Sequence, residues 1–345
     1  MEIDWKSVEK ILVVRLRSIG DTVLTTPTLI ALREFLPNAR IDVLLEDWVA
    51  PVLEGFPAAD EILTVKNSGG DRTRVALNIR KRKYDVAVNL HGGTSAGFLT
   101  RASGARHRIG YRGYQYAFLY NKKYPSPSEF WNRTITHSAE NQIALLGFAG
   151  VPVKPCPKTS LTVTDEARSR IVSRLNTSGV DVEGSSFALI HPGAAYDTKR
   201  WSAEKYASVV KYLENRGMSP VVVFTDAEAR IVRQIESALG RGVNKCSGLS
   251  LPEVTALASI SSLFVGNDSG IAHIAAAVGT PLVVVFGSSN RDQWGPWTDA
   301  PHRVVFTPLE CQPCPGDICS VYGDPKCIIE VTVDQVTAAI DQILR

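Results

Sequence analysis

The sequence predicts an α/β protein made of two doubly wound domains in series, each built on a mostly parallel sheet. Apolar runs typical of buried strands alternate with helical segments from residue 10 onward, and the scheme repeats in the second half of the chain. Strand–helix–strand units of this kind are right-handed and form parallel sheets. With 345 residues, the chain is long enough for two domains, expected at 1–157 and 158–330 with a deep cleft between them.

The first half supplies one sheet and its helices. Strands are expected at Ile11–Leu16, Ile41–Leu45, Glu61–Val65 and Tyr84–Leu90, and helices at 21–35, 71–83 and 141–148. The stretch 110–130, rich in Tyr, Pro and Ser, interrupts the pattern and predicts a loop or lid. Residues 151–158 are typical of a linker.

The second half repeats this organisation. Strands are expected at 187–190, 221–224, 263–265 and 282–286, and helices after Ser202, at 227–239, from Ser250 to Ile260 and at 270–278. Ser202 is placed to cap its helix, and Ser250 with Glu253 forms a capping box. A last amphipathic helix within 331–345 is expected to pack back toward the N-terminal domain.

The mostly apolar stretch GNDSGIAHIAAAVGTPLVVVFG, residues 266–287, could be mistaken for a membrane span. Gly279-Thr280-Pro281 divides it into two pieces, each shorter than the ~20 apolar residues that a span requires. A short helix followed by a buried strand explains it better, with the polar residues at the N-terminus of the helix.

Composition and charge narrow the class of protein. The 44% hydrophobic and 21% charged content describes a globular protein, and the N-terminus lacks the apolar core of a signal peptide, so export is not expected. Residues 72–83 are basic with no acid, and residues 101–133 hold seven Lys and Arg against Glu129. These segments are either solvated basic faces or a surface for phosphate, acidic sugar or lipid head groups.

Three turns follow predicted strands, where parallel sheets bind ligands. The first holds Gly20 and Asp21; Asp21 could act on a ligand or only cap its helix. The second, His191 to Trp201, has a glycine and the cations Lys199 and Arg200, which suit a diphosphate or are simply solvated. The third is Gly266-Asn-Asp-Ser-Gly270, with His273 either facing the same ligand or buried and satisfied.

Together and in this order, the motifs resemble glycosyltransferase family 9, the bacterial lipopolysaccharide heptosyltransferases of GT-B fold. The resemblance is carried by ILVVRLRSIGDTVLTTPTLIALREFLPNARIDVL, LIHPGAAYDTKRWSAEKYASVV and VGNDSGIAHIAAAVGTPLVVVFGSSNRDQWGP. It covers nearly the whole chain and implies two Rossmann-like domains facing across a cleft.

The resemblance implies an ADP-heptose donor bound by the C-terminal domain. Lys199 would neutralise the diphosphate, and Glu228 would bind the ribose. The remaining implied donor-binding residues are Leu249 and Ser250 at the adenine, and Asp268, Ser269, Gly270 and His273 at the phosphates and sugar. Hydroxyl residues of some relatives are replaced here by Ala194 and Ala195, so backbone amides or Lys199 would contribute more.

The resemblance also implies the acceptor side. Asp21 would be the general base, and no metal or other cofactor would be required, since the ADP-sugar is a substrate. The residues expected to bind the acceptor are Ser18, Gly20, Arg101, Arg106 and Arg108. The acceptor would be an acidic, lipid-linked core oligosaccharide at the cytoplasmic, inner face of the cytoplasmic membrane, with peripheral attachment to that membrane. Nucleic acid is not expected as a partner.

Four cysteines, Cys311, Cys314, Cys319 and Cys327, form a C-x2-C-x4-C-x7-C cluster. Thiols at such spacing could ligate a structural metal or an iron–sulfur cluster, pack locally, or form a redox-sensitive pair. Three other functions stay open: a GT-B nucleotide-sugar epimerase, a non-catalytic nucleotide-sugar-binding protein, and an iron–sulfur redox protein.

Overall fold

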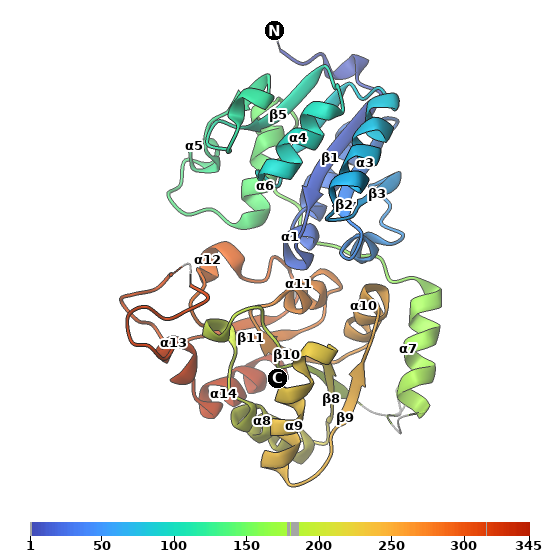
Figure 1. Ribbon diagram of the computed structural model, residues 1–345. Coiled ribbons are helices and arrows are strands. Elements are labelled where there is room, and N and C mark those ends of the chain that lie inside the picture. The colour runs from blue at the N-terminus through green and yellow to red at the C-terminus, as the bar shows by residue number, and fades with distance from the viewer. Residues whose placement is uncertain (1, 178–179, 181–185, 315) are drawn as a thin grey trace. The chain divides into compact units, whose positions relative to one another are not determined.

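The computed structural model describes residues 2–177, 180, 186–314 and 316–345, and the chain divides into two compact units, Met1–Thr162 and Val163–Arg345 (Figure 1). Each unit has a six-stranded sheet whose neighbouring strands all pair in parallel. The strand orders are β3-β2-β1-β4-β5-β6 and β12-β11-β10-β7-β8-β9. The predicted α/β class with two doubly wound sheets is therefore confirmed. The division at Thr162 lies a few residues beyond the predicted one.

The first unit holds the first six strands. They are β1 (Lys10–Leu16), β2 (Arg40–Glu46), β3 (Glu61–Val65), β4 (Val86–Asn89), β5 (His107–Tyr111) and β6 (Lys122–Tyr124). The helices are α1 (Ile19–Val23), α2 (Thr26–Phe35), α3 (Gly69–Lys81), α4 (Thr94–Ala102), α5 (Pro127–Trp131) and α6 (Ser138–Phe148), with 3-10 turns η1 (Trp5–Ser7), η2 (Ala50–Leu53) and η3 (Ala117–Leu119). α3 contacts α4 (Figure 1), and α2 contacts α6.

Two expectations for this unit are corrected. The helix predicted over 21–35 is split into α1 and α2. Thr25, between the two helices, donates from Oγ1 to Gln142 Oε1 at 2.6 Å, and Pro27 has no N–H to continue the helical hydrogen bonds. The stretch 110–130, predicted as a loop or lid, contains η3, β6 and α5. β6 extends the sheet by pairing with β5.

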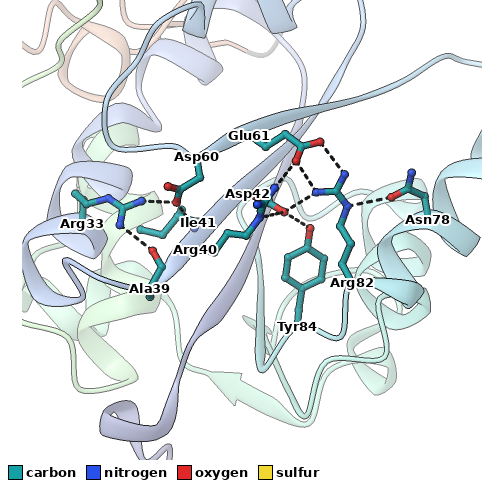
Figure 2. Close-up of polar contacts among 10 residues, drawn as sticks. All are labelled: Arg33, Ala39, Arg40, Ile41, Asp42, Asp60, Glu61, Asn78, Arg82 and Tyr84. Carbon is teal, nitrogen blue, oxygen red and sulfur yellow. Dashed lines mark hydrogen bonds and ion pairs between the residues drawn. The ribbon is translucent and has the colours of Figure 1, made fainter.

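A polar network stabilises the beginnings of β2 and β3 (Figure 2). The Asp42 carboxylate is fully buried and accepts hydrogen bonds from Arg82 at 3.0 Å and from the Tyr84 hydroxyl at 2.6 Å. Arg82 also pairs with Glu61 at 2.7 Å and lowers the pKa of that carboxyl. Arg82, one cation of the basic segment 72–83, thus has a structural role inside the unit, since a buried carboxylate without such partners would destabilise the fold.

The second unit holds the other six strands. They are β7 (Phe187–His191), β8 (Ser219–Phe224), β9 (Asn244–Ser247), β10 (Leu263–Asn267), β11 (Leu282–Val285) and β12 (His302–Val305). The helices are α7 (Asp165–Thr177), α8 (Ala203–Asn215), α9 (Ala229–Leu239), α10 (Leu251–Ser259), α11 (Gly270–Ala277), α12 (Arg291–Trp294), α13 (Lys326–Ile329) and α14 (Val333–Ile343), with 3-10 turns η4 (Asp197–Lys199) and η5 (Asp226–Glu228).

Local signals in this unit behave as predicted. Ser202 caps α8, and Ser250 with Glu253 forms the capping box of α10. The stretch 266–287 becomes the end of β10, α11 and β11, and among the described residues no helix has the length and apolar content to cross a membrane.

The C-terminal helix α14 belongs to the second unit. It contacts α8, β11 and β12, and its Val336 and Ile340 side chains are fully buried in that unit's core. Its apolar face covers the sheet that immediately precedes it in the chain. The expectation that this helix packs toward the N-terminal domain stays a prediction.

Candidate functional site

Sheet topology places one group of polar side chains in each unit. In both sheets the strand order reverses direction at the middle pair, β1 with β4 and β7 with β10. Beyond the carboxyl ends of such a pair the connecting helices run to opposite faces, which leaves room for a ligand. The segments after β1 and β4 form the first half-site, and those after β7 and β10 form the second.

The first half-site is centred on Asp21. Ser18 is the N-cap of α1, and the Asp21 carboxylate accepts from its hydroxyl at 3.0 Å and from its N–H at 3.4 Å. Asp21 also forms an ion pair with Arg15, a buried residue whose Nη1 donates to the Leu90 carbonyl at 2.6 Å. Asp21 thus takes part in capping, as one interpretation expected, but it is also paired with a buried cation. Gly20 is buried in the same turn.

His91 is a further candidate, which was not predicted from the sequence. It follows β4, and its Nδ1 is buried without a hydrogen-bond partner among the described residues. Burial first, and then the positive charge of Arg15, lower the pKa of His91, although the Asp21 carboxylate opposes them. A neutral imidazole therefore lies close to Asp21. A polar residue directly after a central strand is the signal that could have found it.

Arg101, Arg106 and Arg108 lie elsewhere in the first unit. Arg106 precedes β5, and Arg108 aligns through Ala87 of β4 with Leu12, near the amino end of β1. Arg101 is in the last turn of α4, which leads back to the start of β5. Because Asp21 follows the carboxyl end of β1, the structure does not bring these three arginines to the first half-site.

The second half-site contains an ion pair beside a helix N-terminus. Lys199 Nζ lies 2.8 Å from Asp268 Oδ2, and the Asp268 side chain is almost fully buried. Ser269 is the N-cap of α11, yet its side chain makes no capping hydrogen bond. The first amide groups of α11, beginning at Gly270, therefore lack a side-chain cap, and such groups attract anions.

His191 connects this turn to Glu228. Its Nδ1 lies 3.2 Å from Ser269 Oγ, and its Nε2 lies 3.4 Å from Glu228 Oε1. Burial raises the pKa of Glu228, but the hydrogen bond with His191 and those from Thr225 outweigh it and lower the pKa to about 2. Glu228 is thus ionised at neutral pH and can accept hydrogen bonds from ligand hydroxyl groups. His191 was not predicted as a site residue, although it ends a central strand.

Two small or buried residues make this connection possible. Asn267 is fully buried and donates from Nδ2 to the Pro192 carbonyl at 2.9 Å, which fixes the turn after β7 to β10. Gly193 lies against the Glu228 carboxylate and the His191 ring, and a Cβ there would overlap Glu228. The carboxylate can therefore reach His191 only because residue 193 has no side chain.

The second half-site extends along neighbouring strands. Asp268 follows β10, His191 ends β7, Glu228 follows β8, and Leu249 with Ser250 follows β9, in the spatial order β10-β7-β8-β9. At ~4.8 Å between strands, this edge spans about 14 Å. Along this edge, the helix N-terminus that attracts anions comes first, the ionised Glu228 follows, and the half-buried Leu249 comes last. An elongated ligand with phosphate, hydroxylated and flat apolar parts fits this sequence of groups.

His273 and the cysteines complete the predicted residues. His273 is buried in α11 one turn after Gly270, and it interacts within the protein. The four clustered cysteines are free thiols that line one small pocket, where burial first and then the neighbouring thiols raise the pKa of Cys327 to about 11. Among the described residues, no three or more His, Cys, Asp or Glu side chains are arranged to hold a metal ion, so the suggested structural metal finds no support.

Comparisons with known proteins agree with this picture. The sequence model of Glycosyltransferase family 9 (heptosyltransferase) matches residues 72–322. Lipopolysaccharide heptosyltransferase 3 of Escherichia coli is 29% identical over 81% of this chain and 84% of its own length. Lipopolysaccharide heptosyltransferase 2 of Salmonella typhimurium is 28% identical over 97% of this chain and 98% of its own.

Solved structures share the fold. A glycosyl transferase family 9 protein from Veillonella parvula superposes with a TM-score of 0.84 at 23% identity, covering 100% of this chain and 98% of the other. The E. coli ADP-heptose lps heptosyltransferase II superposes with a TM-score of 0.80 at 24% identity, covering 97% and 98%.

Proposed function

Because this chain belongs to glycosyltransferase family 9, we propose that it transfers a heptose, or a related sugar, from an ADP-activated donor to an inner-core acceptor of lipopolysaccharide. The curated relatives at 29% and 28% identity are lipopolysaccharide heptosyltransferases, and the chain spans most of their length. The observation that carries the proposal is the order of groups along the carboxyl edge of the second sheet.

That order suits a nucleotide-sugar. The uncapped N-terminus of α11 and Lys199 would hold the diphosphate, Glu228 would accept from the ribose hydroxyls, and Leu249 would contact the adenine ring. Asp268 keeps Lys199 in place and can accept from a sugar hydroxyl. With Ala194 and Ala195 offering no hydroxyl groups, the α11 amides and Lys199 carry the phosphate contacts.

The chemistry divides between the two half-sites. An acceptor hydroxyl attacks the anomeric carbon, the bond from that carbon to the diphosphate breaks, and Asp21 takes the hydroxyl proton. Negative charge grows on the departing diphosphate, where Lys199 and the α11 amides stabilise it, so the proposed reaction needs no metal. Ser18 and Gly20 border Asp21 and would contact the acceptor. The imidazole of His91 can orient the attacking hydroxyl toward Asp21.

The proposal includes a setting for the reaction. The family acts on an acidic, lipid-linked acceptor, so we place this enzyme at the inner face of the cytoplasmic membrane as a peripheral protein. The isolated chain should therefore transfer sugar to acceptor dispersed in detergent.

Two measurements test the proposal. Calorimetry with ADP, UDP and GDP should show the tightest binding for ADP, weakened about tenfold or more by Lys199→Ala, since a charge-assisted contact is lost. The matched control is Lys211→Ala, an exposed lysine of α8 in the same unit, which should leave ADP binding unchanged. Equal affinity for the three nucleotides would overturn the choice of donor.

The second measurement follows the sugar. Radiolabel from ADP-heptose should appear in lipopolysaccharide extracted from a strain that lacks inner-core heptose. Release of an isomerised sugar or free ADP without labelled lipid would indicate an epimerase, and ADP binding with no turnover would indicate a binding protein.

A further inference from the structure

Three exposed aromatic side chains form a cluster on the first unit. Phe98 lies on α4, and Tyr116 and Phe118 lie in the segment that contains η3, with exposed fractions of 53%, 37% and 74%. The ring centroids are 5.8 Å apart for Phe98 and Tyr116 and 6.0 Å apart for Tyr116 and Phe118. Neighbouring rings left in water indicate a contact surface, because scattered single apolar residues are the usual surface pattern.

Arginines adjoin this cluster. Arg101 follows Phe98 by three residues on α4, so the two side chains share a side of the helix. Arg108 Nε donates to the Leu119 carbonyl at 3.0 Å, directly beyond Phe118, which fixes the aromatic segment to β5. Arg101 is exposed.

These positive charges are not offset inside the protein. Within the described part of the chain, no carboxylate forms an ion pair with Arg80, Arg101 or Arg108. Burial first, and then the charges of Arg101 and Arg80, lower the pKa of Arg108, so the three guanidinium groups repel one another. Arg82 differs, because Asp42 and Glu61 neutralise it (Figure 2). The uncompensated charge favours an anionic partner.

We propose that the surface formed by Phe98, Arg101, Tyr116 and Phe118 docks the protein on an anionic phospholipid bilayer. Aromatic rings settle at the boundary between head groups and acyl chains, and guanidinium groups bind lipid phosphates in pairs of hydrogen bonds. Attraction to an anionic leaflet adds to both effects. The inference rests on the proposed function for its purpose, since a lipid-linked acceptor brings the enzyme to a membrane.

The location of the surface is compatible with catalysis. Arg101 lies in the last turn of α4, toward the amino end of β5, whereas Asp21 follows the carboxyl end of β1, a parallel strand of the same sheet. Docking through these residues would therefore leave the first half-site open to an acceptor that extends from the bilayer.

Co-sedimentation of the full chain with lipid vesicles tests the proposal. Vesicles of phosphatidylcholine and phosphatidylglycerol should bind the protein, vesicles of phosphatidylcholine alone should not, and added salt should weaken binding. The double variant Phe98→Ser with Phe118→Ser should weaken binding about tenfold or more. Arg101→Gln should weaken it about fivefold.

Two variants of the same unit serve as matched controls. Leu77→Ser removes an exposed apolar side chain from α3, and Arg74→Gln removes an arginine that is already paired with Asp71. Both should bind anionic vesicles as the unaltered chain does, and thermal unfolding should show that every variant is folded. No binding, equal binding to neutral vesicles, or equal losses in the controls would overturn the proposal.

Transfer to detergent-dispersed acceptor separates this inference from the proposed function. The double aromatic variant should retain full transfer activity there while losing vesicle binding. If the unaltered chain fails to transfer sugar but binds anionic vesicles through these residues, the proposed function is wrong and the docking surface stands.

Discussion

Asp21 combines two roles that the sequence presented as alternatives. Its carboxylate accepts from the hydroxyl and the N–H of Ser18 and pairs with Arg15. An ionised carboxylate has about four acceptor positions, so one position remains for the proton of an acceptor hydroxyl. The capping contacts therefore hold the proposed base in place, and they do not exclude it from catalysis.

Asp21→Asn should separate these roles. The amide oxygen can still accept from Ser18, so the fold and ADP affinity should stay near normal, whereas transfer should slow by ~100-fold or more because no base remains. Asp71→Asn is the matched control. Asp71 lies in the first turn of α3, where it likewise accepts from a backbone N–H, that of Lys66, and pairs with an arginine, Arg74. Steady-state transfer rates with both variants decide the matter, and unchanged turnover in Asp21→Asn would leave capping as its only role.

Gly193 permits a test of the connection between His191 and Glu228. A methyl group in Gly193→Ala would displace the flexible Glu228 carboxylate from His191, and ADP binding should weaken about tenfold or more while the fold persists. Gly242→Ala, where a Cβ meets only an ordinary contact, should leave binding unchanged. Calorimetric ADP affinities that are equal in the two variants would contradict the role of Glu228 at the ribose.

Which elements the sequence predicted depends on where they lie in the sheets. Central strands such as β1 and β10 are buried on both faces, so their continuous apolar runs identify them. Four strands were missed: β5, which lies inside the first sheet, and β6, β9 and β12, which are sheet edges with sequences KKY, NKCS and HRVV. An edge strand pairs on one side only and tolerates polar residues, so periodicity alone does not reveal it.

The network at the start of β2 and β3 stabilises the first unit. Arg82→Ala would leave the buried Asp42 with Arg40 and Tyr84 as partners, and the free energy of unfolding should fall by about 2 kcal/mol. The exposed pair between Arg74 and Asp71 contributes little, so Arg74→Ala should cost less than about 1 kcal/mol. Urea unfolding of both variants measures the difference, and equal losses would show that burial of Asp42 is not what makes Arg82 important.

At the scale of the whole molecule, the sequence predicted the half-sites better than the surfaces. The turns around Asp21, Lys199 and Asp268 could be placed because each follows a central strand, and parallel topology brings such turns to one edge. The arginines of 101–108 could not be placed, because their position depends on where α4 and β5 begin along the sheet. His91 and His191 stand at the ends of central strands in the sequence, but their contacts with Asp21 and Glu228 needed the structure, since only strand order shows which turns are neighbours.

The donor is expected to bind to the second unit and the acceptor to the first, and hydrogen exchange can check this assignment. ADP should slow amide exchange in the turns after β7, β8, β9 and β10 of the second unit, because the nucleotide would cover their N–H groups and restrict local opening. The turns after β1 and β4, with Asp21 and His91, should exchange at unchanged rates until an acceptor is added. Lys199→Ala should remove most of the protection by ADP, and Asp21→Asn should preserve it. Protection by ADP alone in the first unit would mean that the donor is bound there, and the assignment of donor and acceptor to separate sheets would then be wrong.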